Sequence, residues 1–137
     1  MLFTCAANAL GSDIEYDYFV QHPNQISWVD TCGSWQSKDH DGFYRITHAS
    51  LYGQSFLYAQ WLETNQDGIN TVLHTRSISE LNNDHADISL EKLHCKATKT
   101  GVIVSANAYF GHENKDAIVS ITLLHALGEY RYKRSIK

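Results

Sequence analysis

The sequence contains a single proline, no long apolar run and little net charge, and each of these scarcities excludes a class of protein. One proline leaves no proline-rich linker or recognition strip. No apolar run approaches the ~20 residues of a transmembrane helix. A formal net charge of -4 argues against a general nucleic-acid binder. The chain has 137 residues, of which 43 % are hydrophobic and 19 % charged, so it is neither disordered nor too short to bury a core.

The sequence also lacks the motifs that mark catalysis or cofactor binding. It has no G-x-S-x-G turn for a serine nucleophile and no glycine-rich loop for a phosphate. Its eight histidines show none of the paired spacings that bind zinc, and its three cysteines form no C-x-x-C pair. We therefore expect no metal and no cofactor, and we assign no catalytic residue from the sequence.

Alternating apolar residues and turn signals predict strands along most of the chain. The segment 21–41 has no clear alternation and is expected to be irregular, and Glu80-Leu81 could begin a single helical turn. A slip of the apolar phase near Glu91-Lys92 indicates a bulge. The expected strands cover 14–20, 42–51, 55–62, 69–78, 88–97, 102–110, 117–123 and 129–134. The sequence thus predicts an all-β fold, a single-domain antiparallel β-sandwich or barrel of about eight strands over residues 10–137.

The most apolar part of this pattern is the hairpin 55–78. Apolar and aromatic side chains occupy both faces of 55–62, with Leu57 and Trp61 sharing one face. Asp67-Gly68 then supplies a strong hairpin turn signal. We expect this hairpin to form the centre of the core, with Trp61 buried.

The first residues and the cysteine count both indicate export. Ala7-Asn8-Ala9 has the small-x-small form of a signal-peptidase site, so we interpret residues 1–9 as the remnant of an export signal. The alternative is a first strand or helix of the domain. Cleavage there would remove Cys5, and Cys32 and Cys95 could then form the one internal disulfide of a periplasmic or secreted protein. The alternative is a pair of buried free thiols in the cytosol.

Aromatic residues are plentiful, with eight Tyr, five Phe and three Trp. Exposed aromatic side chains among polar groups are typical of surfaces that bind glycans and proteins. The alternative is that the two tryptophans near Cys32 pack over the disulfide and close one end of the fold. The candidate ligand-binding residues are Trp28, Trp35, Tyr44, Tyr52 and Tyr109.

Charge is divided unevenly along the chain. Residues 1–90 carry eleven acids and three bases, whereas residues 91–137 carry four acids and eight bases. The basic C-terminal end could attract phosphates or anionic lipid, or it could guard an edge strand against aggregation. Two loop histidines beside acids, His40 and His85, could hold a metal or form a His–carboxylate pair if their loops met at one end of the fold.

These observations favour a small exported binding or inhibitor-like module that recognises a protein or a glycan through aromatic-rich loops. One alternative is a cell-envelope hydrolase that uses loop acids and histidines. Another is a structural or assembly protein that pairs through an edge strand. We expect a protein or glycan partner, no nucleic-acid partner and no transmembrane segment, and the sequence leaves the oligomeric state open.

Overall fold

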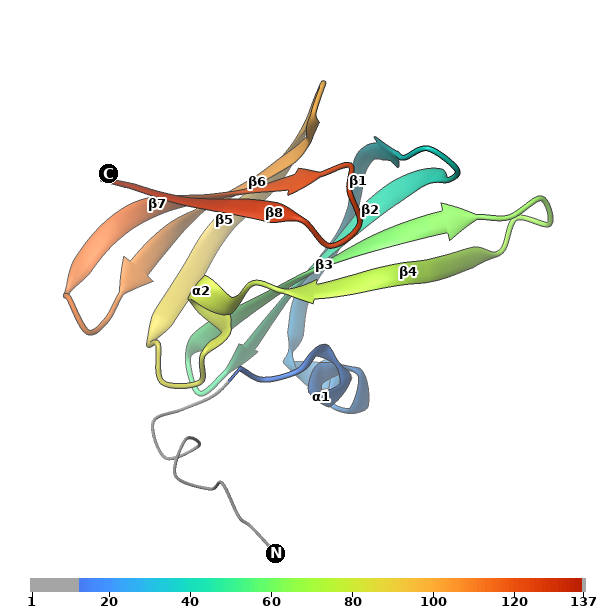
Figure 1. Cartoon of the computed structure of the whole chain (residues 1–137). Coiled ribbons are helices and arrows are strands. Elements are labelled where there is room, and N and C mark those ends of the chain that lie inside the picture. The colour runs from blue at the N-terminus through green and yellow to red at the C-terminus, as the bar shows by residue number, and fades with distance from the viewer. Residues whose placement is uncertain (1–12, 137) are drawn as a thin grey trace, which may run out of the picture.

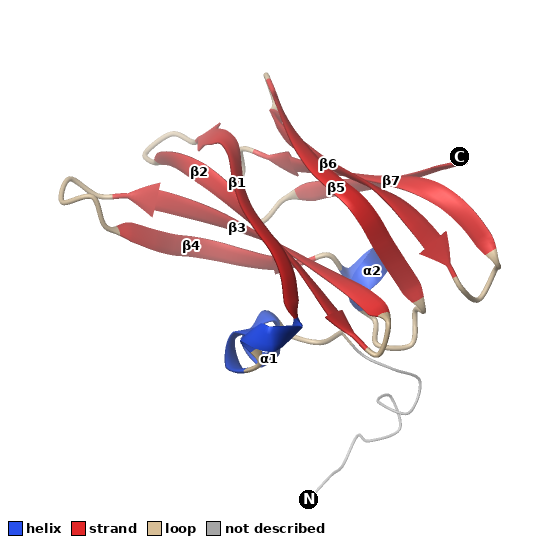
Figure 2. Cartoon of the chain, turned by 180° about the vertical axis from the view of Figure 1, so that it is seen from behind, coloured by secondary structure: helices blue, strands red, loops and turns tan. Residues whose placement is uncertain are grey.

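The computed structural model describes residues 13–136, which form two antiparallel four-stranded sheets packed against each other (Figure 1). The first sheet contains, in this order, β1 (Ile26–Gln36), β2 (Asp41–Leu51), β3 (Gln54–Thr64) and β4 (Asn70–Ser77). The second sheet contains, in this order, β5 (Ile88–Thr98), β6 (Gly101–Phe110), β7 (Lys115–Leu124) and β8 (Tyr130–Ile136). Two short helices, α1 (Tyr16–Gln21) and α2 (Ser79–Asn82), lie towards one end of the strands (Figure 2). The prediction of an antiparallel sandwich of eight strands is confirmed.

One predicted strand was wrong and one observed strand was missed. Residues 14–20 do not form a strand, because most of them belong to the helix α1, which buries Phe19 against Phe56 and Tyr58 of the first sheet. The segment 21–41 is not irregular, because after a 3-10 turn over Pro23–Gln25 it contains β1. Two register shifts break the pairing of β1 with β2, and they also break the alternation of its side chains.

The core lies between the two sheets and depends most on β3. Every residue from Gln54 to Leu62 is buried, and Leu57, Ala59 and Trp61 face the second sheet. The opposite face of β3 is covered at one end by α1. The predicted burial of Trp61 is confirmed, although its hairpin partner β4 is an edge strand and not a central one.

Buried aromatic side chains also join the two sheets by hydrogen bonds. The indole Nε1 of Trp61 and the hydroxyl of Tyr44 both donate to the backbone carbonyl of Leu124, each at 2.9 Å. These bonds satisfy the polar ends of two fully buried rings and fix the end of β7 against the first sheet.

A disulfide closes one side of the sandwich. Cys32 on β1 is bonded to Cys95 on β5, which confirms the predicted pair, and their Cα atoms are 6.2 Å apart. This is well below the roughly 10 Å between packed sheets. Gly33 permits the approach, because a Cβ at this position would lie 2.3 Å from Cγ1 of Val102 on β6.

The opposite side of the sandwich is open. β4 and β8 are the outermost strands there, and within residues 13–136 neither has a second strand hydrogen-bonded to its outer edge. In Figure 1 these two edges face the viewer, with α2 at one end of the space between them. The two sheets are therefore joined covalently on the β1–β5 side and are not joined by strand pairing on the β4–β8 side.

Two further predictions concern an export signal at the start of the chain and a membrane-spanning helix. The proposed signal remnant, residues 1–9, lies outside the described residues. No helix within residues 13–136 has the length and apolar character needed to cross a bilayer.

Candidate functional site

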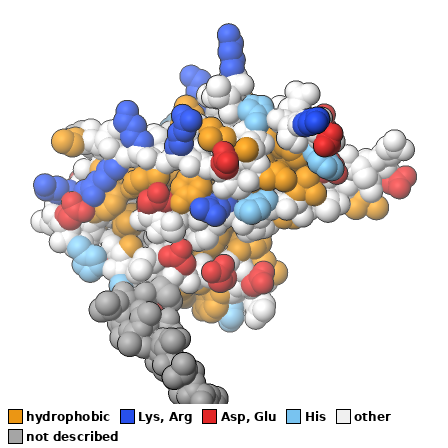
Figure 3. Space-filling model, viewed as in Figure 1, with side chains coloured by type: hydrophobic (Ala, Val, Ile, Leu, Met, Phe, Trp, Pro, Cys, Tyr) orange, Lys and Arg blue, Asp and Glu red, His pale blue; other side chains and the backbone are white. Residues whose placement is uncertain are grey.

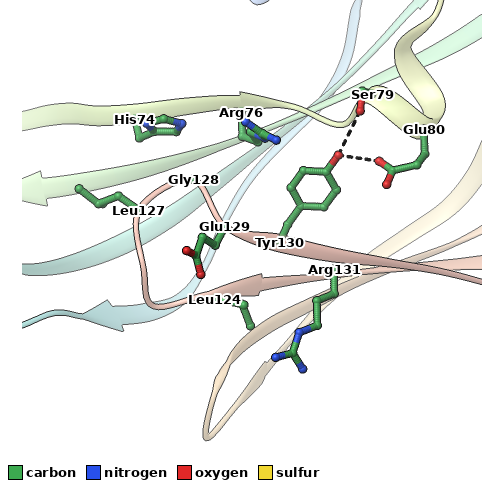
Figure 4. Close-up of a pocket in the computed structure, with 10 residues that line it drawn as sticks. All are labelled: His74, Arg76, Ser79, Glu80, Leu124, Leu127, Gly128, Glu129, Tyr130 and Arg131. Atoms are coloured by element: carbon green, nitrogen blue, oxygen red, sulfur yellow. Dashed lines mark hydrogen bonds between the residues drawn. The ribbon is translucent and has the colours of Figure 1, made fainter.

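A cavity of about 750 Å³ lies on the open side of the sandwich. It forms between β4, the start of α2 and the loop that joins β7 to β8 (Figure 4). We call it the β4–β8 cleft. Its lining is mostly polar and includes cations, carboxylates and a tyrosine. The lining residues are His74, Arg76, Ser79, Glu80, Leu124, Leu127, Gly128, Glu129, Tyr130 and Arg131.

Tyr130 is the centre of a hydrogen-bonded group in this cleft. Its hydroxyl donates to Oε1 of Glu80 at 2.5 Å and lies 3.3 Å from the hydroxyl of Ser79 (Figure 4). The guanidinium carbon of Arg76 lies 5.3 Å from the centre of the Tyr130 ring, which is cation–π distance. Residues from β4, α2 and β8 are thus joined across the open side.

Burial and hydrogen bonding keep this tyrosine in its neutral form. Burial is the main cause that raises the pKa of Tyr130 above its usual value of 10, and the hydrogen bond to Glu80 raises it further. A neutral hydroxyl remains a hydrogen-bond donor. The group Ser79, Glu80 and Tyr130 therefore presents fixed donors and acceptors to a ligand.

His74 closes one end of the cleft. Its ring meets the edge of Trp61, with centroids 6.0 Å apart, and it packs so closely on Gly128 that a Cβ there would lie 2.4 Å from Nε2. Gly128 also has a φ of +78°, a conformation that favours glycine. The β7–β8 loop is therefore fitted against β4 at this point, and the cleft opens beyond it towards Arg76.

Two of the five predicted ligand-binding aromatics, Trp35 and Tyr44, lie in the core and not at the surface. Trp35 is 1 % exposed, and its indole nitrogen donates to the carbonyls of Phe43 and Leu62. Tyr44 is 0 % exposed, and burial raises its pKa to about 12. For Tyr44 the available signal was strand phase, because Tyr44 shares one face of its strand with the buried Ile46 and His48.

The other three predicted aromatics lie on different surfaces. Tyr52 is 98 % exposed at the β2–β3 turn, beside a smaller cavity of about 460 Å³. Tyr109 is 40 % exposed on β6, and its hydroxyl donates to Oδ1 of Asn114 at 2.5 Å. Trp28 is half-buried on β1 and packs against the core. The structure does not bring these three side chains together.

The loop histidines do not meet either. His40 precedes β2 and lies 2.5 Å from a carboxylate oxygen of Glu63. His85 pairs with Asp84 at the other end of the sandwich, where β2 ends and Tyr52 lies. The length of β2 separates these ends by about 33 Å. No group of three or more His, Cys, Asp or Glu side chains able to hold a metal ion occurs within residues 13–136.

Most of the cleft was missed by sequence reasoning. Nothing in the sequence marked His74, Arg76 or Tyr130 as site residues, and Glu80 was noted only as the possible start of a helical turn. The available signal was the alternation of β4, which sends His74 and Arg76 to the same face.

Comparisons with known proteins add no assignment. No family model, no curated protein and no solved structure matches the chain. The fold and the cleft therefore define a structural class, a disulfide-bonded antiparallel β-sandwich with a polar cleft on its open side.

Proposed function

We propose that this protein is an exported binding module that holds an extended segment of a protein partner along the edge of β4. The observation that carries the proposal is the position of the cleft directly beside an edge strand. A peptide paired with β4 would receive main-chain hydrogen bonds from the strand edge, and its alternate side chains would enter the cleft. Export is supported by the disulfide, because such bonds persist in oxidising compartments.

A comparison of the four sheet edges favours β4. β8 carries Arg131, Lys133 and Arg134, and charged edges discourage pairing. β1 has two register shifts and is tied to β5, and β5 has a register shift between Glu91 and His94. β4 has one register shift, at Leu73, which leaves 74–77 as the segment beside the cleft.

The lining of the cleft indicates which side chains it accepts. Along β4, His74 and Arg76 face inward because they pair with the inward-facing Trp61 and Ala59. The carboxylate of Glu80 on α2 and the hydroxyl of Tyr130 on β8 line the same cleft. A partner segment with polar side chains of both charges at every second position fits this lining.

A test is to select peptides from a displayed random library with the full-length, disulfide-bonded protein, and then to scan a selected peptide by backbone N-methylation. Strand pairing predicts loss of affinity by about three- to tenfold at every second position, where a main-chain hydrogen bond is removed. Methylation at the positions between should have little effect. Equal tolerance at all positions would contradict strand addition.

Two arginines of the first sheet provide a matched pair of variants. Arg76→Ser removes a side chain that lines the cleft, whereas Arg45→Ser removes one that lies on the opposite face and bonds Gln60. Only Arg76→Ser should weaken binding of the selected peptide. Equal losses in the two variants would place the binding site elsewhere.

A further inference from the structure

The outer face of the second sheet carries two rows of side chains defined by strand register. In each row, basic or imidazole side chains on β5 and β8 flank small or medium side chains on β6 and β7. The first row is His94, Ser105, Ser120 and Lys133, and the second row is Lys96, Ile103, Thr122 and Arg131. We call these eight residues the basic outer face.

Contacts on the inner side confirm that these rows point outward. Cys95 faces inward because it is bonded to Cys32 of the first sheet, so its neighbours His94 and Lys96 face outward. Tyr130 and Tyr132 pack against the core, so Arg131 and Lys133 face outward. Figure 4 shows Arg131 on the opposite side of β8 from the hydroxyl of Tyr130.

The basic outer face forms a shallow groove, with long cationic side chains on β5 and β8 and shorter side chains between them on β6 and β7. Three interstrand spacings separate β5 from β8 by about 14 Å, with Lys96 on one side and Arg131 and Lys133 on the other. All three cations are exposed, whereas Ser105, Ser120 and Thr122 of the floor are only partly exposed. Short hydroxyl side chains keep this floor low and supply hydrogen-bonding groups.

Charge is separated across the molecule as well as along the chain. Lys and Arg side chains gather over β5–β8, whereas a group of Asp and Glu side chains lies over α1 (Figure 3). The chain as a whole has a formal net charge of -4, so the positive face is a local feature. A surface of one sign raises the local concentration of ligands of the other sign.

We propose that the basic outer face binds an anionic polysaccharide, whose sulfate or carboxylate groups pair with Lys96, Arg131 and Lys133 while its hydroxyls bond the serines and threonine of the floor. A membrane fits less well, because the two rows offer no exposed large apolar side chain for insertion. A nucleic acid fits less well, because they offer no aromatic ring on which a base could stack. This surface shares only Arg131 with the lining of the β4–β8 cleft, and the proposal does not depend on the peptide site.

The test measures binding of the full-length protein to heparin, to neutral dextran, to phosphatidylglycerol vesicles and to duplex DNA. At about 0.1 M salt, where the Debye length is about 10 Å, heparin should bind and dextran should not. Lys96→Ser with Lys133→Ser should weaken heparin binding about tenfold. The matched control is Lys38→Ser with Lys115→Ser, which removes the same charge from the β1–β2 turn and from the start of β7 and should leave binding close to that of the unchanged protein.

Each result supports or overturns the proposal. Selective binding to heparin that falls in the first double variant and not in the control supports it. Equal losses of heparin affinity in both double variants would show that binding depends on the net charge of the protein and not on the basic outer face. Absence of heparin binding, or tighter binding to vesicles or DNA than to heparin, would overturn the assignment to a polysaccharide.

Discussion

At the scale of single residues, His48 shows how one polar side chain is accommodated in the core. It is 7 % exposed on β2, and its Nε2 lies 2.9 Å from the hydroxyl of Ser55. That hydroxyl also accepts a hydrogen bond from the backbone N–H of Leu90 on β5 at 2.8 Å. Ser55 can donate its own proton to a neutral imidazole, so the chain of bonds links the two sheets without a buried charge.

The lowered pKa of His48 predicts how the free energy of unfolding depends on pH. Burial lowers this pKa below the usual 6.5, so the unfolded chain binds the proton more tightly than the folded one. This group therefore leaves the free energy of unfolding unchanged above about pH 6.5 and lowers it as the pH falls below that value. The decline should be at most about 1.4 kcal/mol per pH unit and should end below the folded-state pKa.

Denaturant titrations at several pH values check this, with His48→Gln compared with the exposed His40→Gln. The variant at position 48 should lose the decline below pH 6.5, and the variant at position 40 should retain it. A wild-type curve parallel to that of His48→Gln would show that folding does not lower the pKa of His48.

At the scale of secondary-structure elements, two glycines have similar positive φ angles but differ in the space around them. Comparing alanine variants at these two positions distinguishes the cost of backbone strain from the cost of steric crowding. Gly33 on β1 has a φ of +62°, and Gly68 in the β3–β4 turn has a φ of +79°. A Cβ on Gly68 would meet no atom within 4 Å, whereas a Cβ on Gly33 would clash with Val102. Gly68→Ala should thus cost about 1 kcal/mol from backbone strain alone.

Gly33→Ala should cost about 2–4 kcal/mol, because overpacking adds to the same backbone strain. Chemical denaturation of the two alanine variants measures the difference directly. Equal costs would mean that β1 moves away from β6 freely and that Gly33 is not needed for the approach of the sheets.

At the same scale, strands with an unbroken side-chain period were the most direct to predict from the sequence. β6 sends Val102, Val104 and Ala106 into the core without interruption, and its pattern identified it directly. β1 was missed because its phase changes twice and its inward residues are spaced irregularly. The helix α1 was taken for a strand because Ile14, Tyr16 and Tyr18 alternate with acids, although only Phe19 is buried in the helix.

At the scale of the whole molecule, the site could not be predicted because it depends on which edges face each other. Glu80 and Tyr130 are 50 residues apart in the chain and are joined only after both sheets have formed. The basic outer face was partly foreseen from the charge division, but its rows required the register of four strands. Sequence pattern identified the strands, and their packing created both candidate surfaces.

The disulfide gives the prediction that concerns the whole fold. Cys32 and Cys95 are 63 residues apart and tie the two sheets together on the side opposite the cleft. Closing a loop of this length should stabilise the folded state by about 4 kcal/mol, chiefly by restricting the unfolded chain. Because this is a large part of the roughly 5–15 kcal/mol of an ordinary domain, Cys32→Ser with Cys95→Ser should leave the protein folded but marginal.

Urea unfolding of the oxidised protein, of the reduced protein and of the double variant measures this contribution. The reduced protein and the double variant should lose the same free energy of unfolding, since each lacks only the disulfide bond. Both should fold into the same sandwich. Hydrogen exchange should then show faster opening of β1 and β5, with β3 still protected by its burial on both faces. If the reduced protein unfolds at the same urea concentration as the oxidised one, packing around Gly33 and Val102 alone holds the closed side.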